Sequence, residues 1–390
     1  MVSKQFFRLS TNYFWYFGIL GLVVPFLSVF LDGRGFTSLE IGEILAVITA
    51  TKIVAPSLWA QLADRTGKQL TIVKVGALLS LLCFSLIIWT VSYWPLMFSL
   101  AMFSLFWTAI LPQIEVMTLN SIRRSAKIYA RIRLWGSIGF IIAAMVSGEL
   151  IERYSTEAFS YIGMAILAGL FISTLLSKQP RVANKALVDH VSIKAKVFNG
   201  NFLLFFFAGL MLQMSFGPYY VFFALYLKSL TYSGFLIGIF IAIGVVAEIG
   251  IFVFAAIFFK SFSLKTLLSI SILFTAFRWF LVGHYAESNI ALAASQLIHA
   301  LSFGLYHSAS IAFIQKHFNT NQQSRAQAIY IGGVYGVGGA VGAYVAGILW
   351  QDGLGAVATF DFAAITALVG GILALFLRTQ FIERKATSSG

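Results

Sequence analysis

Long apolar stretches alternate with short polar ones along the whole chain, and this alternation constrains the fold more than any other feature. Each apolar stretch runs for roughly 20–28 residues, enough to cross the ~30 Å hydrocarbon core of a bilayer as one helix. Only 11% of the 390 residues are charged, against about 25% in soluble domains. The sequence therefore predicts an all-α membrane protein with twelve transmembrane helices, at residues 8–31, 39–63, 69–91, 95–121, 128–151, 157–177, 201–227, 234–259, 264–285, 289–315, 325–350 and 357–378.

Two polar segments organise these spans. Basic residues precede the first span and no small-residue cleavage site follows it, so we expect a retained helix rather than a signal peptide. The longest polar stretch separates the sixth span from the seventh. We therefore expect two six-helix halves, residues 1–177 and 201–390, joined by a cytoplasmic linker at residues 178–200.

Basic residues predict the orientation of the chain. Of the 27 Lys and Arg residues, 21 fall at the two termini or in the loops that follow even-numbered spans. Only Arg34, Arg153 and Lys228 fall in the other loops. Because basic loops stay in the cytoplasm, we expect both termini there. The net charge of +13 is spread over these loops and does not form the single patch that nucleic-acid binding requires.

The sequence also contains an internal repeat. A shift of 196 residues aligns the first two spans with the seventh and eighth without a gap, and eight of 40 positions are then identical, from Gly21 with Gly217 to Ala60 with Ala256. Each half has an even number of spans, so the halves share one orientation. A duplication of this kind relates them by an axis along the membrane normal.

Six ionisable side chains stand out inside the spans, where a charge costs at least ~2.5–3.5 kcal/mol. They are Lys52, Glu115, Arg133, Glu248, Arg278 and His299. The 196-residue shift places Lys52 and Glu248 at equivalent positions of the two halves. Such groups must face a water-filled cavity, pair with one another or serve transport, so they are the candidate site. With histidine neutral they carry one excess positive charge, which suits an anionic substrate.

The loop between the second and third spans reads Ala60-Gln-Leu-Ala-Asp64-Arg65-Thr-Gly67-Lys68. It resembles the loop signature of the major facilitator superfamily, Gly-x-Leu-Ala-Asp-Arg-x-Gly-Arg/Lys, but departs from it at Ala60 and at the glutamine that follows Lys68. Gly67 allows a tight turn, and Asp64 and Arg65 can pair or cap helix ends that move during gating. The alternative is an ordinary solvated turn.

The fifth span opens with Arg131-Ile-Arg133-Leu-Trp-Gly136-Ser-Ile-Gly139-Phe140. Glu115 on the fourth span and Arg133 both lie roughly 9–12 Å inside the cytoplasmic end at ~1.5 Å per residue, so antiparallel neighbours bring them to one level. The pattern resembles the lactose permease and 3-phenylpropionate permease branch of the superfamily. The resemblance implies that Glu115 and Arg133 bind substrate, and we add Phe140 of the same motif to the substrate site. A structural ion pair is the alternative.

The tenth span has polar and aromatic residues at helical spacing that predict one face: Gln296, His299, Phe303, Tyr306 and Ser310. Together with Glu248 and Arg278 it resembles the same branch, which implies that Glu248 and His299 contribute to substrate binding. The branch carries a proton-coupling glutamate where this chain has Ser302. We therefore expect Glu248 with His299 to carry the proton. An interhelical hydrogen bond is the alternative role for His299 and the expected one for His307.

Aromatic residues fall at helical spacing near the expected cavity, on the first and seventh spans: Tyr13, Phe17, Phe216 and Tyr220, with Gln213 beside them. Tyr220 is included among the candidate substrate contacts, and packing against lipid or other helices is the alternative. The eleventh span carries a stripe of glycines that includes Gly332, Gly336 and Gly339, which predicts close helix packing.

The resemblance covers essentially the whole chain and implies the major facilitator fold. We expect a proton-coupled uptake symporter of the bacterial inner membrane, active as a monomer on a small organic solute. An aromatic carboxylate such as phenylpropionate is favoured, held by Arg133, Lys52 or Arg278, while Glu115 pairs with Arg133. A sugar or nucleoside symporter is the main alternative function, and an efflux carrier or a passive channel is a less favoured one. The sequence has no catalytic motif, metal-ligand cluster or phosphate-binding loop, so we expect no enzyme activity and no cofactor beyond the coupling proton.

Overall fold

A computed structural model describes residues 2–122, 125–178 and 192–378 of the chain. In this part of the chain twelve helices are long and apolar enough to cross a membrane, and no residue is in a β-strand. Their bounds agree with the predicted spans to within a few residues, so the twelve-span prediction is confirmed. The predicted linker falls largely on residues 179–191, outside the described residues.

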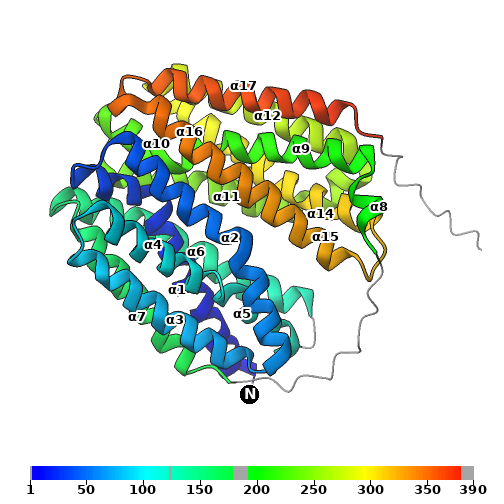
Figure 1. The fold of residues 1–390 in the computed structure, drawn as a ribbon, viewed down its shortest axis with the longest axis horizontal. Helices are drawn as coiled ribbons and strands as arrows, with labels where there is room; N and C mark the ends of the chain where they lie inside the picture. The colour runs from blue at the N-terminus through cyan, green and yellow to red at the C-terminus, as the bar shows by residue number, and fades with distance from the viewer. Residues whose placement is uncertain (1, 123–124, 179–191, 379–390) are drawn as a thin grey trace, which may run out of the picture.

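The first six spans form the lower left part of Figure 1. Their helices are α1 (Val2–Gly33), α2 (Ser38–Thr66), α3 (Gln69–Ser85) continued by η1 (Leu86–Ile88), α4 (Tyr93–Trp107) and α5 (Ile110–Ser121) in the fourth span, α6 (Ala126–Arg153) and α7 (Ala158–Leu175).

The last six spans form the upper right part of Figure 1, after the short helix α8 (Lys194–Val197). Their helices are α9 (Gly200–Ser215) and α10 (Gly217–Ser229) in the seventh span, α11 (Gly234–Ser261), α12 (Leu264–Tyr285), α13 (Asn289–His299), η2 (Ala300–Leu305) and α14 (Tyr306–His317) in the tenth, α15 (Gln323–Tyr330), η3 (Ile331–Gly338) and α16 (Gly339–Trp350) in the eleventh, η4 (Gln351–Gly353), and α17 (Ala356–Leu375).

Equivalent turns of the two halves have the same local chemistry. Thr37 caps α2 by accepting from the backbone N–H of Glu40, and Ser233, 196 residues later, caps α11 by accepting from that of Leu236. Two residues before each cap the backbone is left-handed, with φ of 82° at Gly35 and 66° at Thr231. The matching geometry supports the duplication inferred from the sequence.

Four spans are interrupted near their middle. The fourth breaks between α4 and α5, and the seventh breaks before Gly217 and Pro218, where the proline occupies the first turn of α10. The tenth and eleventh contain the π-helical segments η2 and η3. Adding 196 to the break at residues 108–109 gives 304–305, the end of η2, so the fourth and tenth spans break at equivalent positions. Interrupted helices often mark functional sites in membrane proteins and elsewhere.

The two halves meet closely on the membrane side opposite the chain termini, which we call the distal side. A Cβ added to Gly42 of α2 would lie 2.7 Å from the Cα of Gly347 on α16. On the other side of the interface, one added to Gly238 of α11 would lie 2.7 Å from the carbonyl oxygen of Ala144 on α6. Only glycine allows this approach, so small residues hold the halves together here.

Two hydrogen-bonded contacts cross between the halves on the distal side, and we call them the distal contacts. The Glu152 carboxylate accepts from the backbone N–H of Gly234 at 2.6 Å, at the start of α11. Ser38 at the start of α2 donates to Asp352 Oδ1 at 2.5 Å and accepts from the Asp352 backbone N–H at 2.8 Å. Gly234 and Ser38 are 196 residues apart, so each half holds an equivalent helix start of the other.

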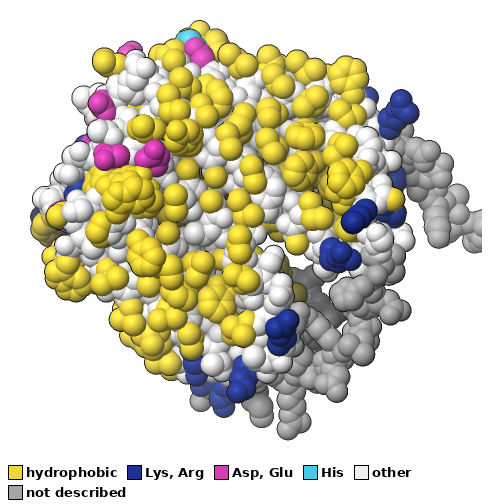
Figure 2. Space-filling model, in the orientation of Figure 1, with side chains coloured by type: hydrophobic (Ala, Val, Ile, Leu, Met, Phe, Trp, Pro, Cys, Tyr) yellow, Lys and Arg dark blue, Asp and Glu magenta, His cyan; other side chains and the backbone are white. Residues whose placement is uncertain are grey.

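The opposite, terminal side is hollowed between the halves. Figure 2 shows the depression, with Lys and Arg side chains gathered mainly along this edge and acidic side chains at the far end. The closed distal side and the hollow terminal side describe one state of a protein with two facing halves.

Candidate functional site

One predicted cation lies on an aromatic ring at the centre of the first half. The guanidinium carbon of Arg133 on α6 lies 3.8 Å from the centroid of the Phe17 ring on α1 and 6.0 Å from that of Tyr13. Its side chain is partly exposed, and no carboxylate of the described residues lies within 4.0 Å of it. A cation–π contact of this kind holds an arginine in place while leaving its N–H donors for another partner.

Glu115 on α5 is held by a tyrosine rather than by the predicted arginine. Tyr129 on α6 donates its hydroxyl to Glu115 Oε1 at 3.4 Å. Arg133 is near enough to interact electrostatically with Glu115, but the two form no direct ion pair. The predicted Glu115–Arg133 salt bridge is therefore wrong in this state. Phe17, Glu115, Tyr129 and Arg133 together form what we call the first-half cluster.

The second half buries its arginine completely. Arg278 on α12 has no exposed surface, and its Nη1 and Nη2 lie 3.0 Å from His299 Nδ1 and 3.3 Å from Gln296 Oε1. Tyr219 on α10 donates to the same Gln296 oxygen at 2.9 Å. The guanidinium carbon also lies 4.4 Å from the centroid of the Tyr219 ring and 4.2 Å from that of Trp279. Tyr219, Arg278, Gln296 and His299 form the second-half cluster.

The contact with Arg278 assigns the tautomer of His299. An arginine has N–H donors only, so His299 Nδ1 must accept, and the ring proton lies on Nε2. Arg278 is completely buried in this state, so its predicted direct contact with the substrate stays a prediction. His299 is hydrogen-bonded to Arg278 and not to Glu248, the partner expected from the sequence.

An aromatic column runs along the tenth span from this cluster. The rings of His299 and Phe303 stack with centroids 5.6 Å apart, those of Phe303 and His307 stack at 6.3 Å, and His307 Nδ1 lies 3.2 Å from the hydroxyl of Tyr335. The stripe predicted from α-helical spacing is only partly correct, because η2 widens the turn between His299 and Tyr306. His299, Phe303 and His307, which are four residues apart, therefore lie on one face. Tyr306 is buried instead, and its hydroxyl is hydrogen-bonded to that of Tyr330.

Glu248 on α11 lies where the two halves face each other. A Cβ added to Gly304 of the tenth span would lie 3.1 Å from Glu248 Cγ, and the carboxylate interacts electrostatically with Arg133 of the first half. Tyr220 and Tyr335 are also close enough to interact with its charge. Glu248 has no hydrogen-bond partner among the described residues and is partly exposed. Arg133 and Glu248 are thus a pair of opposite charges that interacts across the interface at the candidate site.

The other predicted residues lie apart from this pair. Lys52 on α2 is partly exposed and has no hydrogen-bond or ion-pair partner in the described part of the chain. Phe140 is only 8% exposed and packs in the core, so it is not brought to the clusters. Gly67 ends α2 in the predicted tight turn and has left-handed backbone there, with φ of 65°, and Arg65 is exposed beside it. The side chain of Asp64 lies outside the described residues.

Sequence reasoning missed Tyr129, Tyr219 and Tyr335. Tyr129 precedes Arg133 by four residues, so helical spacing alone would have placed both on one face of α6. Tyr219 and Tyr335 carry no comparable signal, because their roles depend on the break before α10 and on the π-helical segment η3.

Comparisons with known proteins agree with this architecture. The model of the MFS_1-like family matches residues 6–362. The chain is 28% identical to the probable 3-phenylpropionic acid transporter of Escherichia coli strain K12 over 90% of its length and 93% of the relative, and 27% identical to the maltose permease of Geobacillus stearothermophilus over 96% and 94%. A crystal structure of the nucleoside transporter NupG superposes with a TM-score of 0.81 at 18% identity, covering 95% of this chain and 97% of that one.

The family model covers most of the chain, and the solved structure shares its fold. A multi-pass membrane transporter with no enzymatic role accounts for the fold, the relatives and the intramembrane charges together. The chain therefore belongs to the MFS_1-like family of major facilitator transporters.

Proposed function

We propose that the protein is a proton-coupled symporter that takes up a small aromatic carboxylate by alternating access. The observation that carries this proposal is Arg133, a partly exposed cation that rests on Phe17 and has no carboxylate within 4.0 Å among the described residues. The relative in Escherichia coli named as a probable 3-phenylpropionic acid transporter supports this substrate class.

The substrate carboxylate binds the guanidinium of Arg133 through two parallel N–H···O bonds. Its ring packs against the aromatic residues of the second half that flank the interface, Tyr220 and Phe303. Lys52 lies apart from Arg133, and its positive charge inside the second span favours an anion over a neutral solute. Arg278 acts at a distance, because it positions His299 instead of touching the substrate.

Coupling to the proton follows from the charge pair across the interface. With no substrate bound, Arg133 attracts Glu248 across the interface, and this attraction favours the charged form of the carboxylate. A bound substrate anion neutralises Arg133, and Glu248 then takes up a proton. The loaded carrier thus moves one anion and one proton together, and Ser302 needs no role in proton transfer. Rocking of the halves about the central site opens the terminal side and the distal side in turn.

Uptake by purified protein in liposomes tests the proposal. A pH gradient, acidic outside, should drive accumulation of labelled 3-phenylpropionate by the wild type but not by Arg133→Ala. Glu248→Gln should exchange substrate down its gradient yet fail to concentrate it. Concentrative uptake by Glu248→Gln would show that another group carries the proton.

Sugar transport is the second candidate, favoured by the maltose permease among the relatives. In that case Glu115 and Arg133, which lie at similar depths in the membrane, would both hydrogen-bond to hydroxyl groups of the sugar. Counterflow separates the two candidates. Saturable exchange of a neutral glycoside without any response to arylcarboxylates would favour the sugar.

A further inference from the structure

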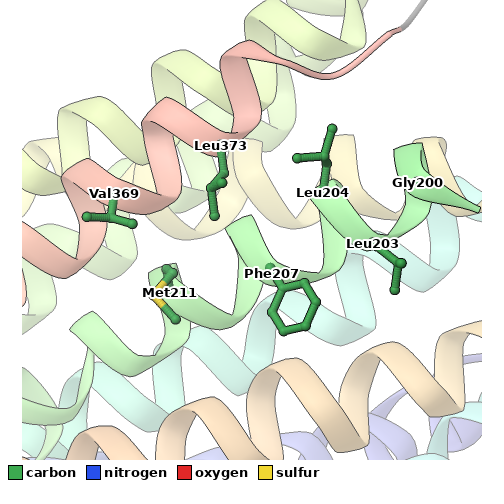
Figure 3. Close-up of a pocket in the computed structure, with 7 residues that line it drawn as sticks. All are labelled: Gly200, Leu203, Leu204, Phe207, Met211, Val369 and Leu373. Carbon is green, nitrogen blue, oxygen red and sulfur yellow. The ribbon is translucent and has the colours of Figure 1, made fainter. Parts of the chain in front are cut away.

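An apolar groove lies on the outside of the second half, away from the candidate site. It has a volume of about 460 Å³ and is formed by α9 and α17, and Figure 3 shows its seven lining residues: Gly200, Leu203, Leu204, Phe207, Met211, Val369 and Leu373. Phe207 and Val369 are 48% and 43% exposed, so the groove opens to the surroundings of the protein. No lining residue carries a polar side chain.

Two contacts between the helices set the spacing of the groove walls. Near the membrane edge the Asn201 side chain accepts from the backbone N–H of Arg378 at 2.8 Å and donates to its carbonyl oxygen at 3.1 Å. Deeper in, Gly370 lets the helices touch, since an added Cβ would lie 2.9 Å from the carbonyl oxygen of Ala208. The groove is therefore a fixed surface feature, because its two walls are joined at Asn201 and again at Gly370.

The depth of the groove matches one leaflet of a bilayer. Eleven helical steps separate Gly200 from Met211, a length of roughly 16 Å at 1.5 Å per residue. Half of the ~30 Å hydrocarbon core is about 15 Å. The groove starts at the terminal side, so it faces the acyl chains of the leaflet on that side.

The open end of the groove is cationic. Arg378 lies three residues after the end of α17 and Lys194 lies in α8 just before α9, and both side chains are exposed. Figure 2 shows Lys and Arg side chains gathered at this end of the molecule, and acidic side chains at the other. An apolar groove one leaflet deep below a positive rim is complementary to a lipid with a negative headgroup.

We propose that this groove binds one acyl chain of an anionic glycerophospholipid such as phosphatidylglycerol, with the phosphate near Arg378 and Lys194. The bound lipid fills the space between α9 and α17. The packing of these helices therefore depends on the anionic lipid content of the leaflet. The site is independent of the transported solute.

Native mass spectrometry of the purified, delipidated protein tests the site with phosphatidylglycerol and, separately, phosphatidylcholine. Val369→Trp fills the groove, and Ile365→Trp is the matched control, because Ile365 is a 61% exposed residue of the same helix outside the groove. Wild type and Ile365→Trp should bind phosphatidylglycerol equally, and Val369→Trp should bind it at least tenfold more weakly. Equal binding by the two tryptophan variants would overturn the proposal.

The charged rim is tested separately, in variants that leave the packing of the groove unchanged. Arg378→Gln and Lys194→Gln should each weaken phosphatidylglycerol binding about fivefold, the effect of one basic residue near a lipid surface. A double variant combines Arg378→Gln with Lys194→Gln. Phosphatidylcholine should bind the wild type as weakly as phosphatidylglycerol binds this double variant. Equal wild-type affinity for both lipids would contradict an anion-selective site.

Discussion

The two intramembrane arginines of this transporter sit in opposite environments. Arg133 in the first-half cluster is partly exposed, rests on one aromatic ring and has no direct ion pair among the described residues. Arg278 in the second-half cluster has no exposed surface, bonds to His299 and Gln296 and lies against two aromatic rings. The difference separates a cation available to a ligand from one committed to holding its neighbours.

The same two halves are alike where they meet on the distal side. Glu152 and Asp352 each bind an equivalent helix start of the other half. Duplication has thus preserved the contacts that close the protein, while the central residues have diverged. We infer that substitutions at the two distal contacts should have equal effects on the closed state. Substitutions of Arg133 and Arg278 should have different effects on binding and stability.

The largest expected effect is on substrate binding at Arg133. Arg133→Ala should weaken 3-phenylpropionate binding at least about 30-fold, since losing one partner of a desolvated charge pair costs ~2–5 kcal/mol. Isothermal titration calorimetry on purified protein measures this loss. Arg131→Ala is the control, because Arg131 is exposed on the same helix. Equal losses in the two variants would remove the distinction between them.

Stability should respond chiefly to the buried arginine. Arg278→Ala leaves buried His299 Nδ1 without its donor and removes one of the two donors to Gln296 Oε1, which should lower the free energy of unfolding by about 2–3 kcal/mol. Thermal unfolding followed by size-exclusion chromatography detects the change. Arg133→Ala should leave the midpoint almost unchanged, and a larger drop for Arg133→Ala than for Arg278→Ala would reverse the comparison.

A smaller effect is expected at the distal contacts. Glu152→Gln and Ser38→Ala should each shift the two-state equilibrium toward the distally open form about fivefold, a change of ~1 kcal/mol. Distances between spin labels on the two halves report the populations. Glu149→Gln, an exposed carboxylate on the same helix as Glu152, should have no effect. A shift in only one of the two variants would show that the contacts are not equivalent.

The smallest effect is expected at Tyr129. Tyr129→Phe removes the hydroxyl that bonds to Glu115 and should weaken substrate binding only several-fold, because one such bond to a charged group is worth roughly 1.5 kcal/mol or less at 3.4 Å. Titration with 3-phenylpropionate checks this. No change at all would indicate that Glu115 does not face the bound substrate.

Hydropathy and charge predicted the spans because each span must be long and apolar to cross the bilayer. The intramembrane residues were equally visible, since any charge inside a span stands out. The pairing of these residues could not be predicted, because it depends on how helices face one another and on local helix geometry. The π-helical segment η2 resets the register between His299 and Tyr306, and Arg278 reaches His299 from another span. Helical spacing alone carries neither fact.

Chemical modification of arginine tests the central comparison most directly. Phenylglyoxal reacts with accessible guanidinium groups, and mass spectrometry of the digested protein locates the adducts. Arg133 should be modified, and 3-phenylpropionate should protect it while the neutral amide of the same acid should not. Arg278 should remain unmodified with or without substrate. Modification of Arg278 that the acid suppresses, with Arg133 unaffected, would contradict the account.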